Sequence, residues 1–242
     1  MSVSFIESVW SALRAQHARG GPDAPWLVAF SGGTDSLALA LLLRRFARAE
    51  PAPKITLVHI DHGLHEASRD WAAAAELLSA KVGFPFHAVR VSVSSANGIE
   101  AGARTVRYDA LGSLLEPGGA VLTAHHQQDQ AETVLLRLMR GAGVEGLGAM
   151  AAYRRFRDGW LVRPLLDADR RELAEMVRNS GLEPLHDPAN DDRRFDRSFL
   201  RAEIMPVLRG RWPAMDRTLA RSAKRRSSLA GSCSGSSPLL RT

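Results

Sequence analysis

Short apolar runs alternate along the chain with longer stretches whose apolar positions have helical spacing. Runs of four to eight apolar and β-branched residues predict buried strands, and apolar positions three and four apart predict helices. The expected strands are Trp26–Phe30, Ile55–Ile60, Phe86–Val93, Ala120–Ala124 and Trp160–Val162. The expected helices between them are Ser36–Arg48, Arg69–Val82, Ile99–Leu115 and Gln130–Arg140. This rhythm predicts an α/β fold, a doubly wound, mostly parallel sheet with helices on both faces.

The pattern changes after a polar, turn-rich segment at Asp187–Asp192. Basic helices are expected over Phe195–Leu208 and Pro213–Arg226, and a Ser/Gly-rich tail follows. The sequence therefore predicts three regions: an α/β domain at 1–190, a basic helical segment at 191–226 and a flexible tail at 227–242.

Charge is unevenly distributed along the 242 residues, whose formal net charge is +6. Between Arg193 and Arg226 there are eleven Lys and Arg against three acidic residues. Such a block suits a polyphosphate partner, most commonly a nucleic acid, although a solvated helical face would have the same composition.

Other features of the composition limit the class of protein. No apolar run is long enough to cross a bilayer, and the first twenty residues resemble an amphipathic helix more than a signal peptide. We therefore expect a cytoplasmic protein without a membrane partner. The single cysteine, Cys233, permits no intrachain disulfide and argues against sulfur-transfer chemistry.

Candidate chemistry begins directly after the first expected strand, in the segment Ser31–Ser36 (SGGTDS). Glycines allow a tight turn that brings backbone amides close to an anion, and the following helix adds its N-terminal N–H groups. The Gly-Lys-Ser/Thr of a Walker loop is missing. Asp35 stands there instead, and a carboxylate beside phosphates suits Mg²⁺. The alternative is a tight strand-to-helix turn with an acid at a favourable helix N-terminus.

The segment SGGTDS resembles the loop of the N-type ATP pyrophosphatases. The resemblance implies an adenine nucleotide α-hydrolase-like fold that uses ATP, cleaving it between the α- and β-phosphates to adenylate a carbonyl oxygen. It further implies that the loop holds the departing pyrophosphate. The residues that this assigns to ATP are Ser31, Gly32, Gly33, Thr34, Asp35 and Ser36.

The second expected strand ends in His59-Ile60-Asp61-His62-Gly63-Leu64-His65. His59, Asp61 and His62 should emerge at the carboxyl edge of the sheet, beside the phosphate loop. They could contact phosphate or base, or they could form a polar loop satisfied by the backbone. The segment resembles the HxDHGLR stretch of the tRNA(Ile)-lysidine synthases, with His65 in place of the usual Arg, and this implies an ATP-binding role for the three.

The fourth expected strand leads into His125-His126-Gln127-Gln128-Asp129-Gln130-Ala131-Glu132-Thr133. Asp129 and Glu132 are three apart and share one helix face, so they could bind Mg²⁺ or the ammonium of a lysine. The alternative is a helix start enriched in acids. The segment closely resembles the HHxDDQAET stretch of the same synthases, except that Gln128 replaces the first of two acids.

Two further segments extend the resemblance. Arg104 and Arg107 lie one turn apart in a stretch like the A-R-x-x-R-Y of the family, which implies that Arg104 sits at the lysine or ATP site. A surface arginine pair is the alternative. The stretches VRPLLDADRREL and HDPANDDRRFDRSFLRAEIMPVL also match the family, with Ser198 where Asn is usual and His186 near a usual acidic or aromatic position.

As a whole, the resemblance implies an enzyme that ligates L-lysine to C2 of the first anticodon cytidine of tRNA(Ile) with a CAU anticodon. ATP and Mg²⁺ are the implied cofactors, and the product would read AUA instead of AUG codons. Asp35 and Asp129 would hold the metal, and His125 or His126 would accept a proton. Lysine would bind at Arg104, Asp129 and Glu132, and tRNA at Arg197, Arg201 and Arg209. A homodimer is plausible by resemblance alone.

The resemblance runs from Trp26 to Pro213, and the tail has no likeness to the family. Three rivals stay open: a tRNA thiolase, which would need reactive cysteines, a GMP or NAD synthetase, and a non-catalytic nucleotide-binding or RNA-binding protein. The substitution Gln128 makes the non-catalytic protein conceivable. So does the lack of the later domains that longer members of the synthase family have.

Overall fold

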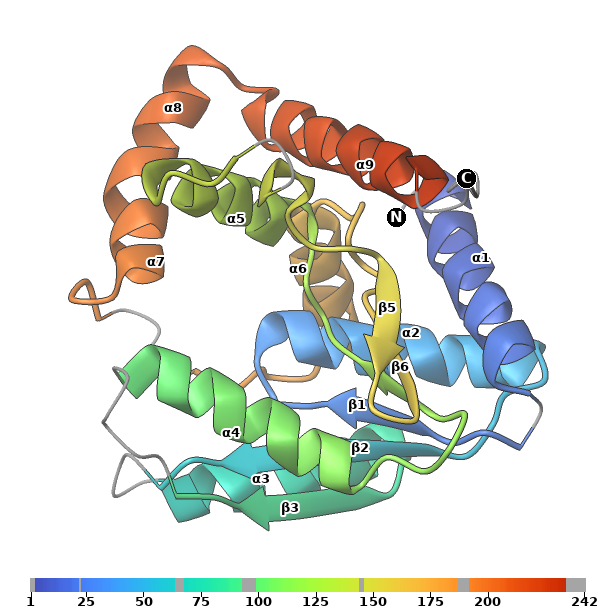
Figure 1. The fold of residues 1–242 in the computed structure, drawn as a ribbon. Helices are drawn as coiled ribbons and strands as arrows, with labels where there is room; N and C mark the ends of the chain where they lie inside the picture. Colours follow the sequence, from blue (N-terminus) through green and yellow to red (C-terminus); the bar gives the residue numbers. More distant parts are fainter. Residues whose placement is uncertain are drawn as a thin grey trace, which may run out of the picture. The chain divides into compact units, whose positions relative to one another are not determined.

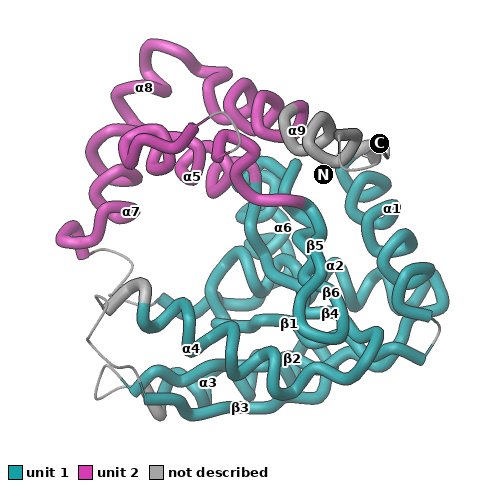
Figure 2. Tube along the Cα trace, in the orientation of Figure 1, with its two compact units in different colours: residues 1–126, 152–188 teal, residues 127–151, 189–242 magenta. Residues whose placement is uncertain are grey.

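The computed structural model describes residues 3–21, 23–63, 68–92, 99–143, 146–186 and 192–233. The chain forms two compact units, coloured separately in Figure 2. Unit 1 comprises Met1–His126 and Ala152–Pro188, and unit 2 comprises Gln127–Ala151 and Ala189–Thr242.

Unit 1 is built on a six-stranded sheet with the strand order β3-β2-β1-β4-β6-β5 (Figure 1). All neighbouring strands are parallel except β5 and β6, which form an antiparallel pair at one edge. The strands are β1 Trp26–Ala29, β2 Ile55–Asp61, β3 Phe86–Arg90, β4 Ala120–Leu122, β5 Tyr153–Phe156 and β6 Gly159–Val162. The chain builds outward from β1 to β3 and then returns to β4 on the other side of β1. The carboxyl ends of β1 and β4 therefore flank a topological switch point, where α/β folds bind ligands.

Both faces of the sheet are buried, because successive residues of a strand point to opposite sides. Val28 and Leu57 belong to a cluster that α1, α2, α3 and α6 complete, whereas Leu27 and Val58 pack with Leu111 of α4 on the other face. The helices of unit 1 are α1 Val3–Gly20, α2 Thr34–Ala49, α3 Ser68–Val82, α4 Ile99–Ser113 and α6 Arg170–Ser180. The expected doubly wound α/β fold is confirmed.

The expected elements of the sheet unit agree with the structure to within a few residues, and the structure adds β5 and α6 there. Strand β3 ends at Arg90, and Val93 lies outside the described residues. The edge strand β5 and the helix α6 were not among the expected elements. Both are polar: β5 has three exposed residues out of four, and α6 buries only Leu173 and Val177.

Unit 2 is helical and has a small core of its own. Its elements are α5 Gln127–Met139, η2 Gly146–Gly148, α7 Asp196–Phe199, η4 Leu200–Ile204, α8 Met205–Arg211 and α9 Met215–Cys233. Ala131 of α5 packs with Leu200, Met205 and Met215. The segment η4 is a π-helix, in which the N–H of Met205 donates to the carbonyl of Leu200. Pro206 follows and has no N–H to continue an α-helical ladder, which favours this irregular turn.

The expected boundary near Asn190 divides the chain at one point, whereas the compact units exchange the chain more than once, because residues 127–151 also belong to unit 2. Residues 127–151 group with the C-terminal helices, because α5 supplies part of the core that buries Leu200 and Met205. Helix α9 extends to Cys233, so the first residues of the expected tail, 227–233, are helical. Residues 234–242 lie outside the described part of the chain.

Among the described residues, none of the helices combines the length and the apolar character that a bilayer span requires.

Candidate functional site

The segment Ser31–Ser36 connects β1 to α2 at the switch point of unit 1. The hydroxyl groups of Ser31 and Ser36 lie 3.2 Å apart, and the amide of Gly33 donates to Ser31 Oγ over 3.3 Å. Ser36 Oγ donates to the Gly33 carbonyl over 3.0 Å. Gly33 stands at the N-cap of α2 and has no side chain with which to cap it. The loop is therefore a tight turn whose backbone leads straight into a helix N-terminus, the arrangement that suits a phosphate.

Gly32 is the position where this turn requires a glycine. Its φ is +78°, and a Cβ built there would lie 2.6 Å from Leu185 Cδ1. The amide of Leu185 also donates to the Gly32 carbonyl over 2.9 Å. The segment after α6 thus closes against the back of the loop, and Gly32 gives it the room to do so.

Asp35 lies in the first turn of α2 and faces two basic groups of unit 1. Its Oδ1 is 3.4 Å from Arg170 Nε, and its Oδ2 is 3.6 Å from His126 Nε2. The Asp35 side chain is 31% exposed, whereas that of His126 is 2% exposed. Arg170 begins α6, 135 residues away in sequence, and the sequence analysis did not single it out. The carboxylate is oriented by these neighbours and still reaches solvent.

His59 near the end of β2 is buried beneath the loop. Its Nδ1 lies 3.0 Å from the carbonyl oxygen of Phe30. A carbonyl can only accept, so Nδ1 carries the proton and Nε2 has a lone pair in the neutral ring. Burial lowers the pKa of His59, and this outweighs the Phe30 hydrogen bond and the nearby Asp61, which raise it. His59 thus supports the loop as a neutral imidazole. Its Nδ1 proton is used by the Phe30 carbonyl, so this N–H is not directed at a phosphate.

Asp61 and His62 follow at the carboxyl edge. Asp61 is 8% exposed, and its Oδ1 accepts from the amide of Gly63 over 2.8 Å. His62 Nε2 lies 3.3 Å from Arg107 Nη2 of α4. The structure therefore brings His62 and Arg107 together. His65, which departs from the family pattern, lies outside the described residues.

At the end of β4, the two adjacent histidines have different surroundings. His125 Nδ1 is 2.8 Å from Thr123 Oγ1, and His125 is partly exposed. His126 is buried and turns towards Asp35. The contact with Asp35 joins the end of β4 to the phosphate loop within unit 1.

Arginines gather around Tyr108 on α4. The Cζ of Arg104 lies 5.1 Å from the Tyr108 ring centroid. Arg163, directly after β6, is 5% exposed, and burial lowers its pKa although Tyr108 acts in the opposite direction. Arg163 lies in the stretch VRPLL that the resemblance covers, yet its burial could not be read from that motif.

Unit 2 contains the other expected carboxylates, Asp129 and Glu132, on α5. The side chain of Glu132 is 2% exposed and accepts from Arg201 through both oxygens, over 2.9 and 2.8 Å. Asp129 Oδ1 accepts from Arg201 Nη2 over 3.2 Å. Arg197 Nε lies 3.2 Å from Glu132 Oε2, and its Nη2 donates to Thr133 Oγ1 over 2.7 Å. A bidentate pair of this kind fixes both partners.

The three arginines expected to contact tRNA are thus all engaged within unit 2. Arg197 and Arg201 bind the α5 carboxylates, and Arg209 is bidentate with Asp216 over 2.7 and 3.2 Å. Exposed basic side chains lie instead along α9, at Arg217, Arg221 and Arg225.

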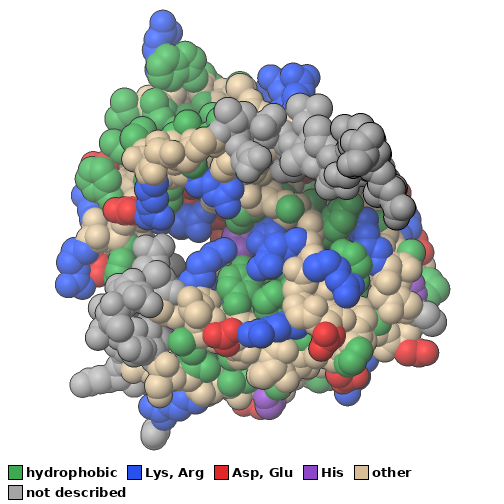
Figure 3. All heavy atoms as spheres, viewed as in Figure 1, with side chains coloured by type: hydrophobic (Ala, Val, Ile, Leu, Met, Phe, Trp, Pro, Cys, Tyr) green, Lys and Arg blue, Asp and Glu red, His purple; other side chains and the backbone are tan. Residues whose placement is uncertain are grey.

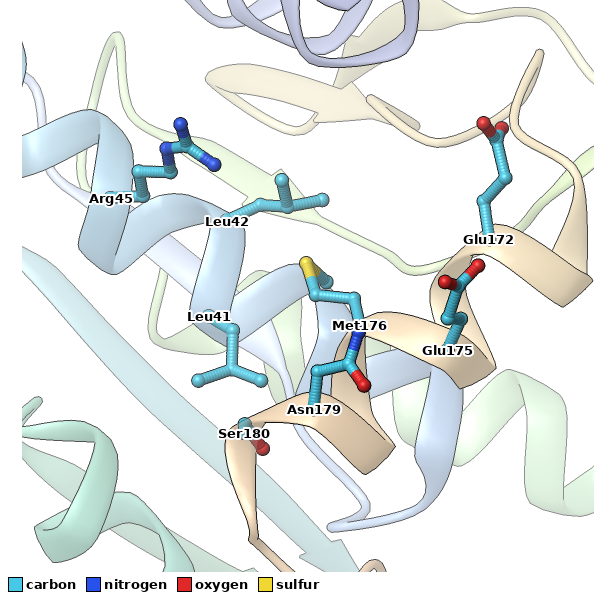
Figure 4. A pocket seen from close by; sticks show the side chains of 8 residues that line it. All are labelled: Leu41, Leu42, Arg45, Glu172, Glu175, Met176, Asn179 and Ser180. Carbon is cyan, nitrogen blue, oxygen red and sulfur yellow. The ribbon is translucent and has the colours of Figure 1, made fainter. Parts of the chain in front are cut away.

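The described residues also form a hollow away from the loop, between α2 and α6 (Figure 4). It measures about 270 Å³, and Leu41, Leu42 and Met176 form its apolar part. Charged and polar side chains complete the lining, namely Arg45, Glu172, Glu175, Asn179 and Ser180. Leu41, Leu42 and Arg45 lie on α2 beyond its first turn, which carries the end of the phosphate loop, and the other lining residues lie on α6.

Carboxylates near the loop determine whether it fits Mg²⁺. In the described part of the chain, no cluster of three or more His, Cys, Asp or Glu could hold a metal alone. Mg²⁺ usually binds through one or two carboxylates together with substrate phosphates and water. Asp35, partly exposed beside an anion-binding loop, fits that role.

The switch-point position, the glycine turn and the carboxylate in the first helical turn define an ATP-binding α/β protein of the PP-loop class. A family model described as "PP-loop domain" matches residues 9–208. The chain belongs to this family.

Within it, the chain is similar to proteins named tRNA(Ile)-lysidine synthase. That of Pseudomonas fluorescens strain Pf0-1 is 43% identical over 198 residues, 82% of this chain and 45% of that protein. That of Pseudomonas aeruginosa is 44% identical over 198 residues, with the same coverage. The chain thus spans less than half the length of these curated relatives.

A solved structure supports the fold independently. The U34-tRNA thiolase NcsA from Methanococcus maripaludis has a TM-score of 0.71 and 16% identity, covering 91% of this chain and 78% of that one. At this identity the likeness concerns the fold alone.

Proposed function

We propose that the chain carries out the reaction of a tRNA(Ile)-lysidine synthase. ATP adenylates the C2 carbonyl oxygen of the first anticodon cytidine in tRNA(Ile) with a CAU anticodon, and L-lysine then displaces AMP. The observation that carries this proposal is the SGGTDS turn, placed at the switch point with His126 against Asp35. The similarity to synthases along 82% of the chain supports the choice of substrate.

In this proposal the loop residues Ser31 to Ser36 bind the β- and γ-phosphates of ATP. Backbone amides and two hydroxyl groups surround the position where pyrophosphate leaves, so they stabilise charge that grows in the transition state. Asp61 and His62 line the same edge of unit 1, and the neutral His59 supports the turn through Phe30. The base of ATP then lies towards the carboxyl ends of the strands.

Asp35 would hold Mg²⁺ against the phosphates, with Asp129 as the second carboxylate. When bound, the ion neutralises negative charge on the phosphate oxygens. The chain's own contribution is orientation, because Arg170 and His126 keep the Asp35 carboxylate at the mouth of the loop.

Lysine binding is proposed at Arg104, Asp129 and Glu132. The lysine ε-amine must lose a proton before it attacks C2, since the free amine has a pKa near 10.4. His126 faces Asp35 and is buried, so we assign this proton to His125, which is partly exposed beside Thr123. The two-step reaction then needs only that amine and adenylated base be held together.

For tRNA, we propose the exposed basic residues of α9 in addition to Arg197, Arg201 and Arg209. The latter three already bind carboxylates of unit 2, so reversing their charge would break unit 2 as well as any RNA contact. Arg217, Arg221 and Arg225 are exposed and give a cleaner test of the interface. A cytoplasmic location and a homodimer complete the proposal.

The test is a pyrophosphate-release assay with ATP, lysine and tRNA(Ile). Pyrophosphate release that needs tRNA(Ile), and AMP production that needs lysine, support the synthase. AMP production with tRNA(Ile) but without any lysine dependence would refute it.

A second candidate is a nucleotide-binding module without turnover. It is favoured by the engagement of Asp129 and Glu132 with Arg201, which occupies the proposed ammonium site. ATP binding measured by calorimetry, combined with no pyrophosphate release under any substrate combination, would establish this module instead.

A further inference from the structure

The edge of the sheet in unit 1 carries arginines that are stacked on aromatic rings. The Cζ of Arg19, at the end of α1, lies 3.8 Å from the ring centroid of Tyr153 on β5. The Cζ of Arg155 lies 4.8 Å from the ring centroid of Trp160 on β6. Tyr153 and Trp160 meet edge to face, with centroids 6.3 Å apart. We call these four residues the stacked-arginine surface.

Stacking leaves these guanidinium groups ready to bind an anion. A guanidinium that lies over a ring uses its flat face, and its five N–H donors point outward in its plane. Arg19 and Arg155 are exposed, and Tyr153 is 48% exposed. Neither arginine has an acidic partner among the residues that the structure describes. The rings therefore hold two exposed cations that no acidic side chain of the described residues neutralises.

The charge continues onto the other side of the same strand. Arg154 points opposite to Arg155, as expected for neighbours on a strand, and its Cζ lies 5.5 Å from the Phe156 ring centroid. Figure 3 shows Lys and Arg side chains gathered over β5 on the face it draws. The edge strand thus presents positive charge on both of its sides.

Charged residues on an edge strand have a simpler explanation, because they prevent two sheets from pairing edge to edge. Any charged side chain would serve that purpose, and lysine is the usual one. Edge protection also needs no aromatic partner and no contribution from α1. Here two arginines from different elements each lie over an aromatic ring, Tyr153 exposed and Trp160 partly buried, and paired guanidinium groups suit phosphate recognition.

We propose that the stacked-arginine surface binds the phosphate backbone of RNA. The bidentate N–H fork of arginine matches a phosphate, and pre-stacking reduces the side-chain entropy lost on binding. The proposal rests on the proposed function only in taking RNA as the partner, and it adds a contact on unit 1 to the basic residues of unit 2.

The experiment measures the affinity of the full chain for tRNA(Ile) by fluorescence anisotropy at several salt concentrations. The double variant Arg19→Gln, Arg155→Gln removes both stacked cations. We expect about tenfold weaker binding near 0.15 M salt and a salt slope reduced by roughly 1.5, as for two lost phosphate contacts. A matched control, Arg48→Gln with Arg178→Gln, removes the same charge from exposed positions on α2 and α6. Equal losses in both double variants would overturn the proposal, because general charge would then explain the binding.

A second variant separates stacking from charge. Arg19→Lys with Arg155→Lys keeps both charges but loses the planar fork, so we expect binding between that of the wild type and the Gln variant. Affinity equal to the wild type would overturn the role of the stacks. If the Gln variant instead self-associates by sedimentation while its monomer binds RNA normally, the arginines protect the edge and do not bind RNA.

Failure of this inference is distinguishable from failure of the proposed function. Pyrophosphate and AMP release at saturating tRNA(Ile) report the reaction, and the salt slope reports the surface. An inactive chain whose RNA affinity still depends on Arg19 and Arg155 would sustain the surface and reject the synthase.

Discussion

Acidic side chains near the start of a helix occur in both compact units, in opposite environments. Asp35 on α2 is 31% exposed, and Arg170 Nε and His126 Nε2 lie 3.4 and 3.6 Å from its oxygens. Glu132 on α5 is 2% exposed and bound through both oxygens by Arg201. The first carboxylate is oriented but accessible, which suits a ligand. The second is saturated, which suits a clamp between helices.

This difference shows what a sequence motif can and cannot specify. Both acids lie in segments that resemble the same enzyme family, Asp35 in the first turn of α2 and Glu132 in the second turn of α5. Their environments depend on residues far away in sequence, Arg170 for Asp35 and Arg201 for Glu132. Variants that exchange or remove these contacts can therefore test the contrast between the units.

The largest effect is expected from Asp35→Asn. If the carboxylate holds a metal against the departing pyrophosphate, its loss should lower the rate of pyrophosphate release by about a thousandfold. The fold should persist, because the Asp35 side chain is 31% exposed and its contacts with Arg170 and His126 span 3.4 and 3.6 Å. Release is measured at saturating ATP, and thermal unfolding serves as the control. A variant that releases pyrophosphate at near the wild-type rate would contradict the metal role.

The loop can also be broken through its backbone. Gly32→Ala places a methyl group 2.6 Å from Leu185 Cδ1 at a φ of +78°. Strain and overpacking together should cost about 3 kcal/mol of unfolding free energy, and ATP affinity should fall with it.

Gly181→Ala is the matched control for Gly32, since Gly181 has a φ of +71° and no atom within 4 Å of a built Cβ. There the left-handed strain acts alone and should cost about 1 kcal/mol. Both values come from urea unfolding. Equal losses would show that Leu185 yields easily and does not constrain the loop.

The carboxylate clamp of unit 2 is tested by Glu132→Gln. The neutral amide leaves Arg197 and Arg201, partly shielded from water, without their main counter-charge. Because both arginines keep some solvent contact, we expect a loss of about 2 kcal/mol, less than for a fully buried pair. Urea unfolding followed by circular dichroism gives the value.

An exposed ion pair in the same unit provides the comparison. Arg140 and Asp196 meet over 2.6 Å, with both side chains 65% exposed. Asp196→Asn should therefore cost no more than about 0.5 kcal/mol. If the two variants unfold alike, Glu132 does not clamp the helices of unit 2.

The sequence specified most of the sheet because its central strands are covered on both faces. Such strands are continuous apolar runs. The buried residues Trp26, Leu57 and Val121 belong to such runs, which made β1, β2 and β4 predictable from the sequence. The edge strand β5 was missed because its sequence YRRF is exposed at three of four positions. Helix α6 was missed because it buries one narrow stripe, Leu173 and Val177, within a strongly polar segment.

For the site, local motifs predicted which residues would be present, and tertiary contacts decided what each one touches. The turn at Ser31–Ser36 follows from its glycines and its place after a strand. Nothing local indicates that Arg170 would face Asp35, or that Arg201 would bind Glu132. The arginines expected to contact RNA are basic in sequence, but their charge is balanced by acids that only the fold brings near.

The smallest effect concerns His59, which supports the loop of unit 1 from below. Burial lowers the pKa of His59 from its ordinary value of 6.5, so the unfolded chain binds a proton more readily than the folded one. Stability is then fully present above about pH 6.5 and declines as the pH falls through that value, levelling off only below the folded pKa. His59→Asn keeps an N–H that can donate to the Phe30 carbonyl but removes the titration. We expect its unfolding free energy to fall less than that of the wild type between pH 7.5 and 5.5.

The control is His87→Asn, which removes an exposed imidazole. An identical decline in the wild type and His59→Asn would mean that burial does not lower the pKa of His59, and the ring could then carry a proton below about pH 6.5.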